Sequence, residues 1–212
     1  MVLSNITKKY GEKVVFDNLS YSFLPNKITV ILGDSGVGKT TLIKIILGLT
    51  DYEGRVENTG VLACVFQNDR LLPNLSVREN LLFVNKEINV EEELEKVDML
   101  EAIDYYPNML SSGMSRRVDI VRALNYKCET LLMDEPLRNL DYYMKYKMID
   151  RIKDYHSKNN NTLIIVTHDL KVAVELADRI IILKNSTGIC KEITKISKDT
   201  ENEILDFLIK KA

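Results

Sequence analysis

The chain has 212 residues, of which 45 % are hydrophobic and 28 % are charged, and its formal net charge at neutral pH is −2. This composition is ordinary for a globular protein of one large or two small domains, and it gives no basic field that would favour nucleic acid as a partner. No apolar run approaches the roughly 20 residues that span a bilayer. Three cysteines, Cys64, Cys128 and Cys190, lie far apart in the sequence. Because an odd number of distant cysteines makes a poor disulfide framework, we expect a cytoplasmic protein.

The first thirty residues have the composition of β-strands. Short apolar runs around Val2, Ile6 and residues 14–16 and 21–23 are separated by turn residues. Tyr10 stands just before a glycine in a polar stretch. Such an aromatic ring can stack on a nucleotide base, or it can simply cover the edge of a sheet, and the residue type leaves both interpretations open.

Residues 33–40 read Gly-Asp-Ser-Gly-Val-Gly-Lys-Thr, the G-x-x-x-x-G-K-T pattern of a phosphate-binding loop. An apolar run with strand composition precedes it at 28–32, and a helix that Gly48 ends is predicted to follow over 41–48. Glycines let backbone N–H groups turn around an anion, and the helix adds its positive end. We expect Lys39 to reach the β- and γ-phosphates and the Thr40 hydroxyl to ligate Mg²⁺. The predicted nucleotide contacts are Gly33, Asp34, Ser35, Gly36, Val37, Gly38, Lys39, Thr40 and Thr41.

A second buried strand, predicted over 61–66, ends at Gln67. Ligands bind at the carboxyl ends of parallel strands in open α/β sheets, so the Gln67 amide is placed to reach a metal ion or an attacking water. The alternative is an amide that caps a turn.

Residues 68–125 have helical periodicity, and we interpret them as a helical insertion between two halves of one nucleotide-binding sheet. A capping box at 76–79 opens one helix, and an amphipathic helix is predicted over 90–102. Another helix opens at 111–117 and runs through Leu124. Its small first residues are good helix caps and also a ready anion site, and the sequence does not choose between the two.

An apolar strand over 130–135 ends in two carboxylates, Asp134 and Glu135. In this position an aspartate holds Mg²⁺ and a second carboxylate polarises a water for in-line attack. A long helix follows Asp141 to about residue 158, and His168 then stands at the end of a buried strand, within reach of a γ-phosphate. The remaining predictions are a helix over 170–177, a hairpin of 179–183 with 189–193 around a turn at 185–188, and a terminal helix over 199–209.

Along nearly its whole length the chain resembles the ATP-binding subunit of ABC transporters. In chain order, the matching motifs are the adenine-stacking aromatic (Tyr10), Walker A (33–40), the Q-loop (Gln67), the LSGGQ signature (110–114), Walker B with the catalytic glutamate (131–135), the D-loop (140–141) and the switch histidine (His168). Many nucleotide-binding families share the phosphate loop. The signature-like stretch and the histidine are what separate this family from kinases and GTPases.

The resemblance implies an α/β fold, a P-loop NTPase with a mixed or parallel central sheet, an N-terminal antiparallel β subdomain and an inserted helical subdomain. It implies one ABC ATPase domain over 1–212, in which 1–66 and 126–212 form the core and 67–125 the helical subdomain. ATP would lie between the Walker A loop of one subunit and residues 111–114 of a second. The implied nucleotide contacts beyond Walker A are Tyr10, Ser111, Ser112, Gly113 and Asp141. The implied Mg²⁺ ligands are Thr40, Gln67 and Asp134, and the implied catalytic residues are Glu135, His168, Lys39 and Gln67.

The signature departs from the family at two positions that would face the second ATP. Ser112 replaces the first glycine and Met114 replaces the glutamine, and Arg116 also stands where a glutamine is common. These changes leave nucleotide binding intact in principle and put the rate of hydrolysis in question. They motivate one alternative, a weakly active nucleotide-binding partner in a heterodimeric transporter. A cytosolic ABC ATPase outside transport is a second alternative.

The implied partners are transmembrane permease subunits, a second ATP-binding subunit and, for an importer, a solute-binding protein. The implied location is the cytoplasmic face of the cell membrane. Residues 66–73 are similar to those of importers for nitrate, sulfonates or taurine, and 132–136 also favour import. The same leucine-proline pattern occurs in export-type subunits, and 139–141 favour export, so export stays open beside the import that we expect. In the family, the region after Gln67 docks on the membrane partner. Here the stretch 71–76 is either that docking site or a plain apolar loop.

Overall fold

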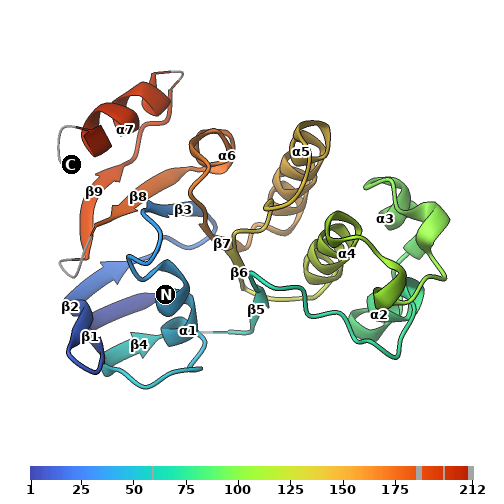
Figure 1. Cartoon of the computed structure of the whole chain (residues 1–212), viewed down its shortest axis with the longest axis horizontal. Coiled ribbons are helices and arrows are strands. Elements are labelled where there is room, and N and C mark those ends of the chain that lie inside the picture. Colours follow the sequence, from blue (N-terminus) through green and yellow to red (C-terminus); the bar gives the residue numbers. More distant parts are fainter. Residues whose placement is uncertain (59, 185–187, 198, 210–212) are drawn as a thin grey trace. The chain divides into compact units, whose positions relative to one another are not determined.

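The computed structural model describes residues 1–58, 60–184, 188–197 and 199–209 (Figure 1). The chain forms two compact units. The first combines Met1–Gly60 with Asn161–Ala212, and the second is Val61–Asn160.

An antiparallel sheet in the first unit has the strand order β2-β1-β4. Its strands are β1 (Val2–Tyr10), β2 (Lys13–Ser22) and β4 (Glu53–Glu57). Leu3 and Ile6 of β1 are buried, while Tyr10 lies opposite Lys13 at the end of the β1–β2 ladder. The β-rich N-terminal region predicted from the sequence is therefore confirmed.

A second sheet segment in this unit has the order β7-β3-β8-β9. Its strands are β3 (Ile28–Gly33), β7 (Thr162–Val166), β8 (Arg179–Leu183) and β9 (Ile189–Ile193), with the helices α1 (Lys39–Ile46), α6 (Leu170–Leu176) and α7 (Thr200–Ile209). Strand β3 is parallel to β7 and β8, and nearly every residue of these strands is buried, as expected where both faces of a parallel sheet are covered. The predicted pairing of β8 with β9 is confirmed, while residues 185–187 of its turn lie outside the described residues.

The second unit pairs β5 (Leu62–Val65) in parallel with β6 (Thr130–Asp134) and contains four α-helices and two 3₁₀ turns among its described residues. These are α2 (Val77–Val84), α3 (Val90–Glu95), η1 (Leu100–Ala102), η2 (Pro107–Met109), α4 (Ser112–Leu124) and α5 (Tyr142–Asn159). The predicted capping box at the start of α2 is confirmed. The Glu79 N–H donates to the Ser76 hydroxyl at 3.2 Å, and the Glu79 carboxylate accepts from the Ser76 N–H at 2.8 Å.

The prediction of one helix over 90–102 is wrong, because α3 ends at Glu95. Asp98 has a left-handed backbone (φ 52°), which stops the helix. The Arg117 guanidinium donates to the carbonyls of Val97 and Asp98 at 2.8 and 3.1 Å. These carbonyls are satisfied by a distant side chain, so the chain need not continue the helix to bond them.

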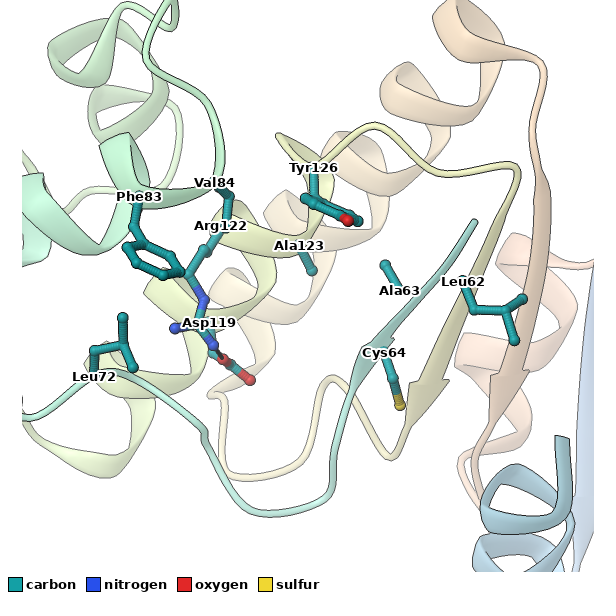
Figure 2. A pocket seen from close by; sticks show the side chains of 10 residues that line it. All are labelled: Leu62, Ala63, Cys64, Leu72, Phe83, Val84, Asp119, Arg122, Ala123 and Tyr126. Atoms are coloured by element: carbon teal, nitrogen blue, oxygen red, sulfur yellow. Dashed lines mark hydrogen bonds and ion pairs between the residues drawn. The ribbon is translucent and has the colours of Figure 1, made fainter. Parts of the chain in front are cut away.

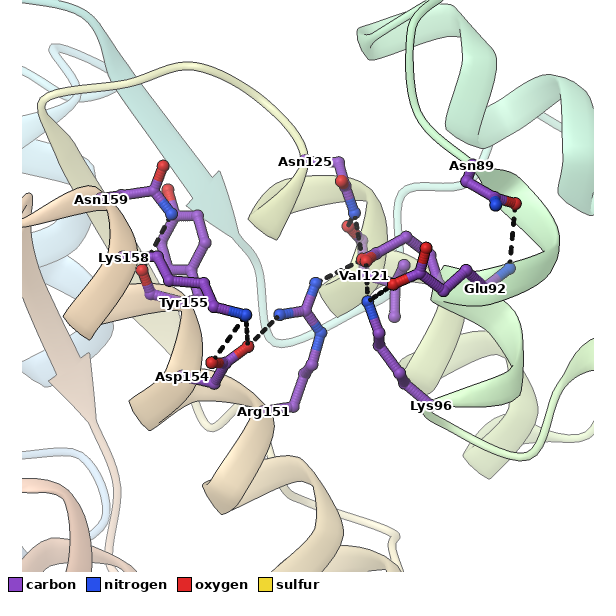
Figure 3. Close-up of polar contacts among 11 residues, drawn as sticks. Asn89, Glu92, Lys96, Val121, Asn125, Arg151, Asp154, Tyr155, Lys158 and Asn159 are labelled. Atoms are coloured by element: carbon purple, nitrogen blue, oxygen red, sulfur yellow. Dashed lines mark hydrogen bonds and ion pairs between the residues drawn. The ribbon is translucent and has the colours of Figure 1, made fainter.

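A polar cluster around Glu93 joins α3, α4 and α5 (Figure 3). The Glu93 carboxylate accepts hydrogen bonds from Lys96 and Asn125, both at 2.8 Å, and from Arg151. Burial raises the pKa of Glu93, but the hydrogen bonds from Asn125 and Lys96 and the charge of Arg151 outweigh it, so the pKa lies below its ordinary value. These ion pairs and hydrogen bonds link three helices of one unit.

The two compact units divide at other positions than the predicted helical subdomain. Strands β5 and β6 and helix α5 group with the helices of 67–125. The functional division into a core and a helical subdomain stays a prediction. None of the helices within the described ranges is both long and apolar enough to cross a membrane.

Candidate nucleotide-binding site

Residues 33–38 join β3 to α1, and the structure gives a steric reason for two glycines in this loop. Gly33 and Gly38 have φ values of 155° and 113°. A Cβ on Gly33 would lie 2.6 Å from the Leu183 carbonyl oxygen, and one on Gly38 would lie 2.7 Å from a methyl group of Val15. A side chain at either position would displace its neighbours, so the loop geometry depends on glycine.

Lys39 is the first residue of α1 and is 8 % exposed. Its ammonium donates to the carbonyls of Gly33 at 2.6 Å and Asp34 at 2.9 Å, so the side chain lies back across the loop. The N-cap residue of α1 is Gly38, which has no side chain to cap the helix, and the first turn holds no acidic residue. A helix start with a lysine and without a carboxylate suits phosphate oxygens, as the sequence predicts.

A cavity of about 280 Å³ opens beside the loop. It is lined by Lys13, Val14, Val15, Asp34, Ser35, Gly36 and Val37. Tyr10 is 49 % exposed, pairs across the ladder with the lining residue Lys13 and carries the Lys8 ammonium 4.6 Å from its ring centre. Its adenine-stacking role stays a prediction. The β2 wall of the cavity was missed from the sequence, because Val14 and Val15 look like ordinary strand residues.

His168 leaves the same edge of the sheet as the phosphate loop. Ile31 of β3 lies opposite Val166 of β7, and the Thr167 N–H donates to the Ile31 carbonyl at 3.1 Å. Gly33 and His168 each follow this pair by two residues at the carboxyl ends of parallel strands. His168 is exposed. The first unit thus brings together the loop and the histidine that the sequence singled out.

The second unit brings Gln67 and the two acidic residues to one edge in the same way. Val65 of β5 lies opposite Met133 of β6, so Gln67 and Glu135 each follow this pair by two residues. Asp134 is 2 % exposed. Glu135 has a left-handed backbone (φ 49°), and the Arg138 N–H donates to its carbonyl at 3.2 Å, so the carboxylate sits in a tight turn. Backbone strain of this kind is often found at functional sites, and the sequence carried no signal for it.

The signature-like residues lie at the start of α4 beside the turn that precedes α5. Ser111 caps α4 by accepting from the Met114 N–H at 3.2 Å, and both Ser111 and Ser112 are exposed. A Cβ on Gly113 would lie 3.4 Å from the Asn139 carbonyl oxygen. Asp141 is also exposed and caps α5 through the Met144 N–H at 2.9 Å. Ser111 therefore acts as a helix cap, and its binding of an anion stays a prediction.

The predicted magnesium ligands suit that ion chemically. Thr40, Gln67 and Asp134 offer a hydroxyl, an amide and a carboxylate oxygen, which are the hard donors that Mg²⁺ prefers. Thr40 and Thr41 lie in the first turn of α1, in the first unit, whereas Gln67 and Asp134 belong to the second. The prediction of a Mg²⁺ site is therefore supported by the chemistry of these three oxygen donors.

The fold and the phosphate loop define a nucleotide-binding α/β protein of the P-loop class. Residues 16–138 match the family model described as ABC transporter. The chain belongs to this family, which confirms the resemblance and the α/β P-loop NTPase fold inferred from the sequence.

Relatives with named functions support the same assignment. The chain is 35 % identical over 207 residues to the Fe(3+) ions import ATP-binding protein FbpC of Fusobacterium nucleatum, covering 86 % of this chain and 55 % of that protein. It is 35 % identical over 195 residues to the aliphatic sulfonates import ATP-binding protein SsuB of Bacillus subtilis, covering 84 % of this chain and 75 % of that protein. The chain thus spans little more than half the length of the iron-import relative.

One solved structure extends the comparison to three dimensions. It is the dimeric post-hydrolysis state of the ATP-binding cassette MJ0796 bound to ADP and Pi. The two chains superpose with a TM-score of 0.77 at 28 % identity, over 91 % of this chain and 97 % of the other.

Proposed function

We propose that the chain binds and hydrolyses ATP to power an ABC membrane transporter, in the direction of import. The observation that carries the proposal is Lys39, whose side chain lies across a glycine loop at the start of α1. The import names of the two relatives support the direction, and the ADP and Pi in the solved cassette support hydrolysis.

In the proposed mechanism, Lys39 and the loop N–H groups stabilise the charge that develops on the transferring phosphoryl group. Glu135 orients or deprotonates the attacking water, and His168 contacts the γ-phosphate. The oxygens of Thr40, Gln67 and Asp134 would hold Mg²⁺, which when bound would neutralise charge on the phosphate oxygens. Tyr10 stacks on the adenine, beside the wall that Lys13 provides.

The site is proposed to be completed by a second copy or a related subunit. Ser111, Ser112, Gly113 and Asp141 lie together at the surface of the second unit, which suits contact with the nucleotide of another subunit. The dimeric state of the solved cassette supports this arrangement. ATP then acts as a ligand of the closed dimer, and hydrolysis reopens it.

The permease partner has a candidate surface in the second unit, a cavity of about 350 Å³ next to the stretch after Gln67 (Figure 2). Its lining includes Leu72, Tyr126 and Phe83, which is 69 % exposed. Exposed apolar side chains around a hollow are typical of protein interaction sites. Of the two readings of 71–76, the cavity supports permease docking and, with it, a position at the cytoplasmic face of the membrane. A solute-binding protein would complete the proposed importer.

The signature departures support a second candidate, a weakly active partner in a heterodimer. Ser112 narrows the approach to α4, and Met114 offers no amide for a hydrogen bond. In this case the chain would bind ATP at Lys39 and contribute a poor signature to its partner.

The test is steady-state ATP hydrolysis by the purified chain, beside equilibrium binding of a fluorescent ATP analogue. Glu135→Gln should keep binding and slow turnover by about 10²–10⁴-fold. A wild-type chain that binds ATP but barely hydrolyses it, together with a double variant, Ser112→Gly with Met114→Gln, that restores hydrolysis, would favour the weakly active partner. A wild-type chain that binds no ATP would refute both candidates.

A further inference from the structure

Arg116 lies in α4 with only 3 % of its surface exposed, and it contacts the backbone around Gln67. Its guanidinium donates to the Phe66 carbonyl at 2.7 Å and to the carbonyl of Gln67 itself. It also pairs with the Asp69 carboxylate at 3.2 Å. One buried side chain thus binds the backbone of Phe66 and of the predicted metal ligand Gln67 and the side chain of Asp69, two residues further on.

The same helix holds the next part of this segment through Arg122. The Arg122 guanidinium donates to the Arg70 carbonyl at 2.8 Å and is itself oriented by the Asp119 carboxylate at 2.8 Å and by Asn80 at 3.2 Å. Asn80 of α2 is fully buried and exchanges two hydrogen bonds with the backbone of Leu72, at 2.8 and 3.1 Å.

Residues 66–75 belong to no helix or strand. The Leu75 N–H donates to the Leu72 carbonyl at 3.2 Å, but no ladder or helical turn fixes the backbone around Gln67. The conformation there depends on the side chains that bind its carbonyls. A carbonyl held at Gln67 fixes the peptide plane, and with it the direction in which the Gln67 side chain leaves the backbone. Groups that hydrogen-bond to a metal ligand orient it, and losing such a group typically weakens metal binding by about 10- to 100-fold.

We propose that Arg116 is a positioning residue for Gln67, and that its hold on the Gln67 carbonyl sets the affinity of the site for Mg²⁺. The proposal rests on the proposed function, in which Gln67 is a magnesium ligand. Arginine is suited to this task because its planar fork carries five donors and serves two carbonyls and a carboxylate at once. A lysine keeps the charge with Asp69 but lacks the fork, and a glutamine supplies one NH₂ group without charge.

A purely structural role for Arg116 makes a different prediction. It would lower the stability of the fold on removal and leave the magnesium dependence unchanged. Arg151 provides the matched control. It is also an arginine of the second unit with an 11 % exposed side chain, and its ion-pair partners, Glu93 and Asp154, both lie outside the stretch 66–75.

The experiment compares Arg116→Gln, Arg116→Lys, Asp69→Asn and Arg151→Gln with the wild type. The readouts are the Mg²⁺ concentration at half-maximal tightening of fluorescent ATP-analogue binding, hydrogen exchange of the amides at 67–72, and thermal unfolding. We expect Arg116→Gln to raise the Mg²⁺ midpoint by about 10-fold and to speed exchange at 67–72. Arg116→Lys and Asp69→Asn should give smaller shifts, and Arg151→Gln should lower thermal stability with the midpoint unchanged.

Equal Mg²⁺ midpoints for the wild type and a folded Arg116→Gln or Arg116→Lys would overturn the role of Arg116 while leaving the proposed function intact. An Arg151→Gln variant that shifts the midpoint as much as Arg116→Gln would overturn it as well, since the effect would then be general destabilisation. If the wild type bound no ATP with Mg²⁺ present, the proposed function would be lost first and the role of Arg116 with it.

Discussion

Glu93→Gln is expected to destabilise the chain far more than the same change at the neighbouring Glu92. Glu93 is buried with an 11 % exposed side chain and is bound by Lys96, Asn125 and Arg151. Glutamine has nearly the same shape, so the substitution removes the negative charge and puts a donor group where an acceptor stood. Glu92 also pairs with Lys96, at 2.7 Å, but its side chain is 58 % exposed.

The contacts around Glu93 set the range expected for the loss of unfolding free energy in Glu93→Gln. Breaking a buried ion pair costs about 3–5 kcal/mol when the remaining charge has no other partner. Here Lys96 keeps Glu92 at 2.7 Å and Arg151 keeps Asp154 at 3.3 Å, so neither cation is left alone. We therefore expect Glu93→Gln to lower the free energy of unfolding by about 1.5–3 kcal/mol. The exposed Glu92→Gln should cost about 0.5 kcal/mol or less.

The assay is urea unfolding followed by circular dichroism between neutral and acid pH. The folded pKa of Glu93 lies below its ordinary value of 4.5, so its contribution to stability is full above that pH and is lost as the pH falls through the folded pKa. The difference between wild type and Glu93→Gln should hold steady from neutral pH to about pH 5 and shrink below it. Equal costs for Glu93→Gln and Glu92→Gln would refute the reasoning, as would a difference that grows in acid.

Three further predictions concern the loop, a helix cap and a thiol. Gly33→Ala should cost about 1–3 kcal/mol of stability, because its Cβ would lie 2.6 Å from the Leu183 carbonyl oxygen. Gly11→Ala, which meets no atom within 4 Å, should cost only the 1–2 kcal/mol or so of its left-handed backbone, and thermal unfolding in which Gly11→Ala is the more damaging would contradict this. Asp141→Ala removes the cap of α5 and should lower the free energy of unfolding by about 1 kcal/mol, whereas Asp141→Asn should keep most of that stability. Equal losses in the two variants would contradict the role of Asp141 as a cap. Partial burial, with smaller effects from the charges of Asp134 and Asp119, raises the pKa of the Cys64 thiol to about 12. Iodoacetamide should therefore label Cys64 slowly in the native protein at mildly alkaline pH and fast in urea, and equal rates would count against the raised pKa.

The phosphate loop was predictable because its signal is local. The strand at 28–32, the glycines and Lys39 follow one another in one short stretch of sequence. The whole loop is therefore built from neighbouring residues. The start of α4 was equally predictable, since Ser111 caps the helix that follows it directly. Parallel strand ends then bring His168 to the edge occupied by Gly33, which follows from strand order alone.

The missed features depend on contacts between residues far apart in the chain. Helix α3 ends before Asp98, whose backbone is left-handed, and the Arg117 guanidinium, about twenty residues later, binds the carbonyls of Val97 and Asp98 just beyond the helix. The amphipathic pattern of 90–102 contains no trace of that bond. The hold of Arg116 on the Gln67 carbonyl spans 49 positions and was invisible for the same reason. The left-handed backbone of Glu135 is likewise set by its turn, because glutamate has no intrinsic preference for it.

In the proposed function, the phosphate loop is half of a site that a second ATP-binding subunit completes. Light scattering of Glu135→Gln with and without ATP and Mg²⁺ is the sharpest test of this claim, because slowed hydrolysis should trap the closed state. We predict that the measured mass rises on adding ATP from the 24.3 kDa of one chain to about twice that value, and that Lys39→Ala stays monomeric. A Glu135→Gln protein that binds ATP and remains at the mass of one chain would contradict the claim.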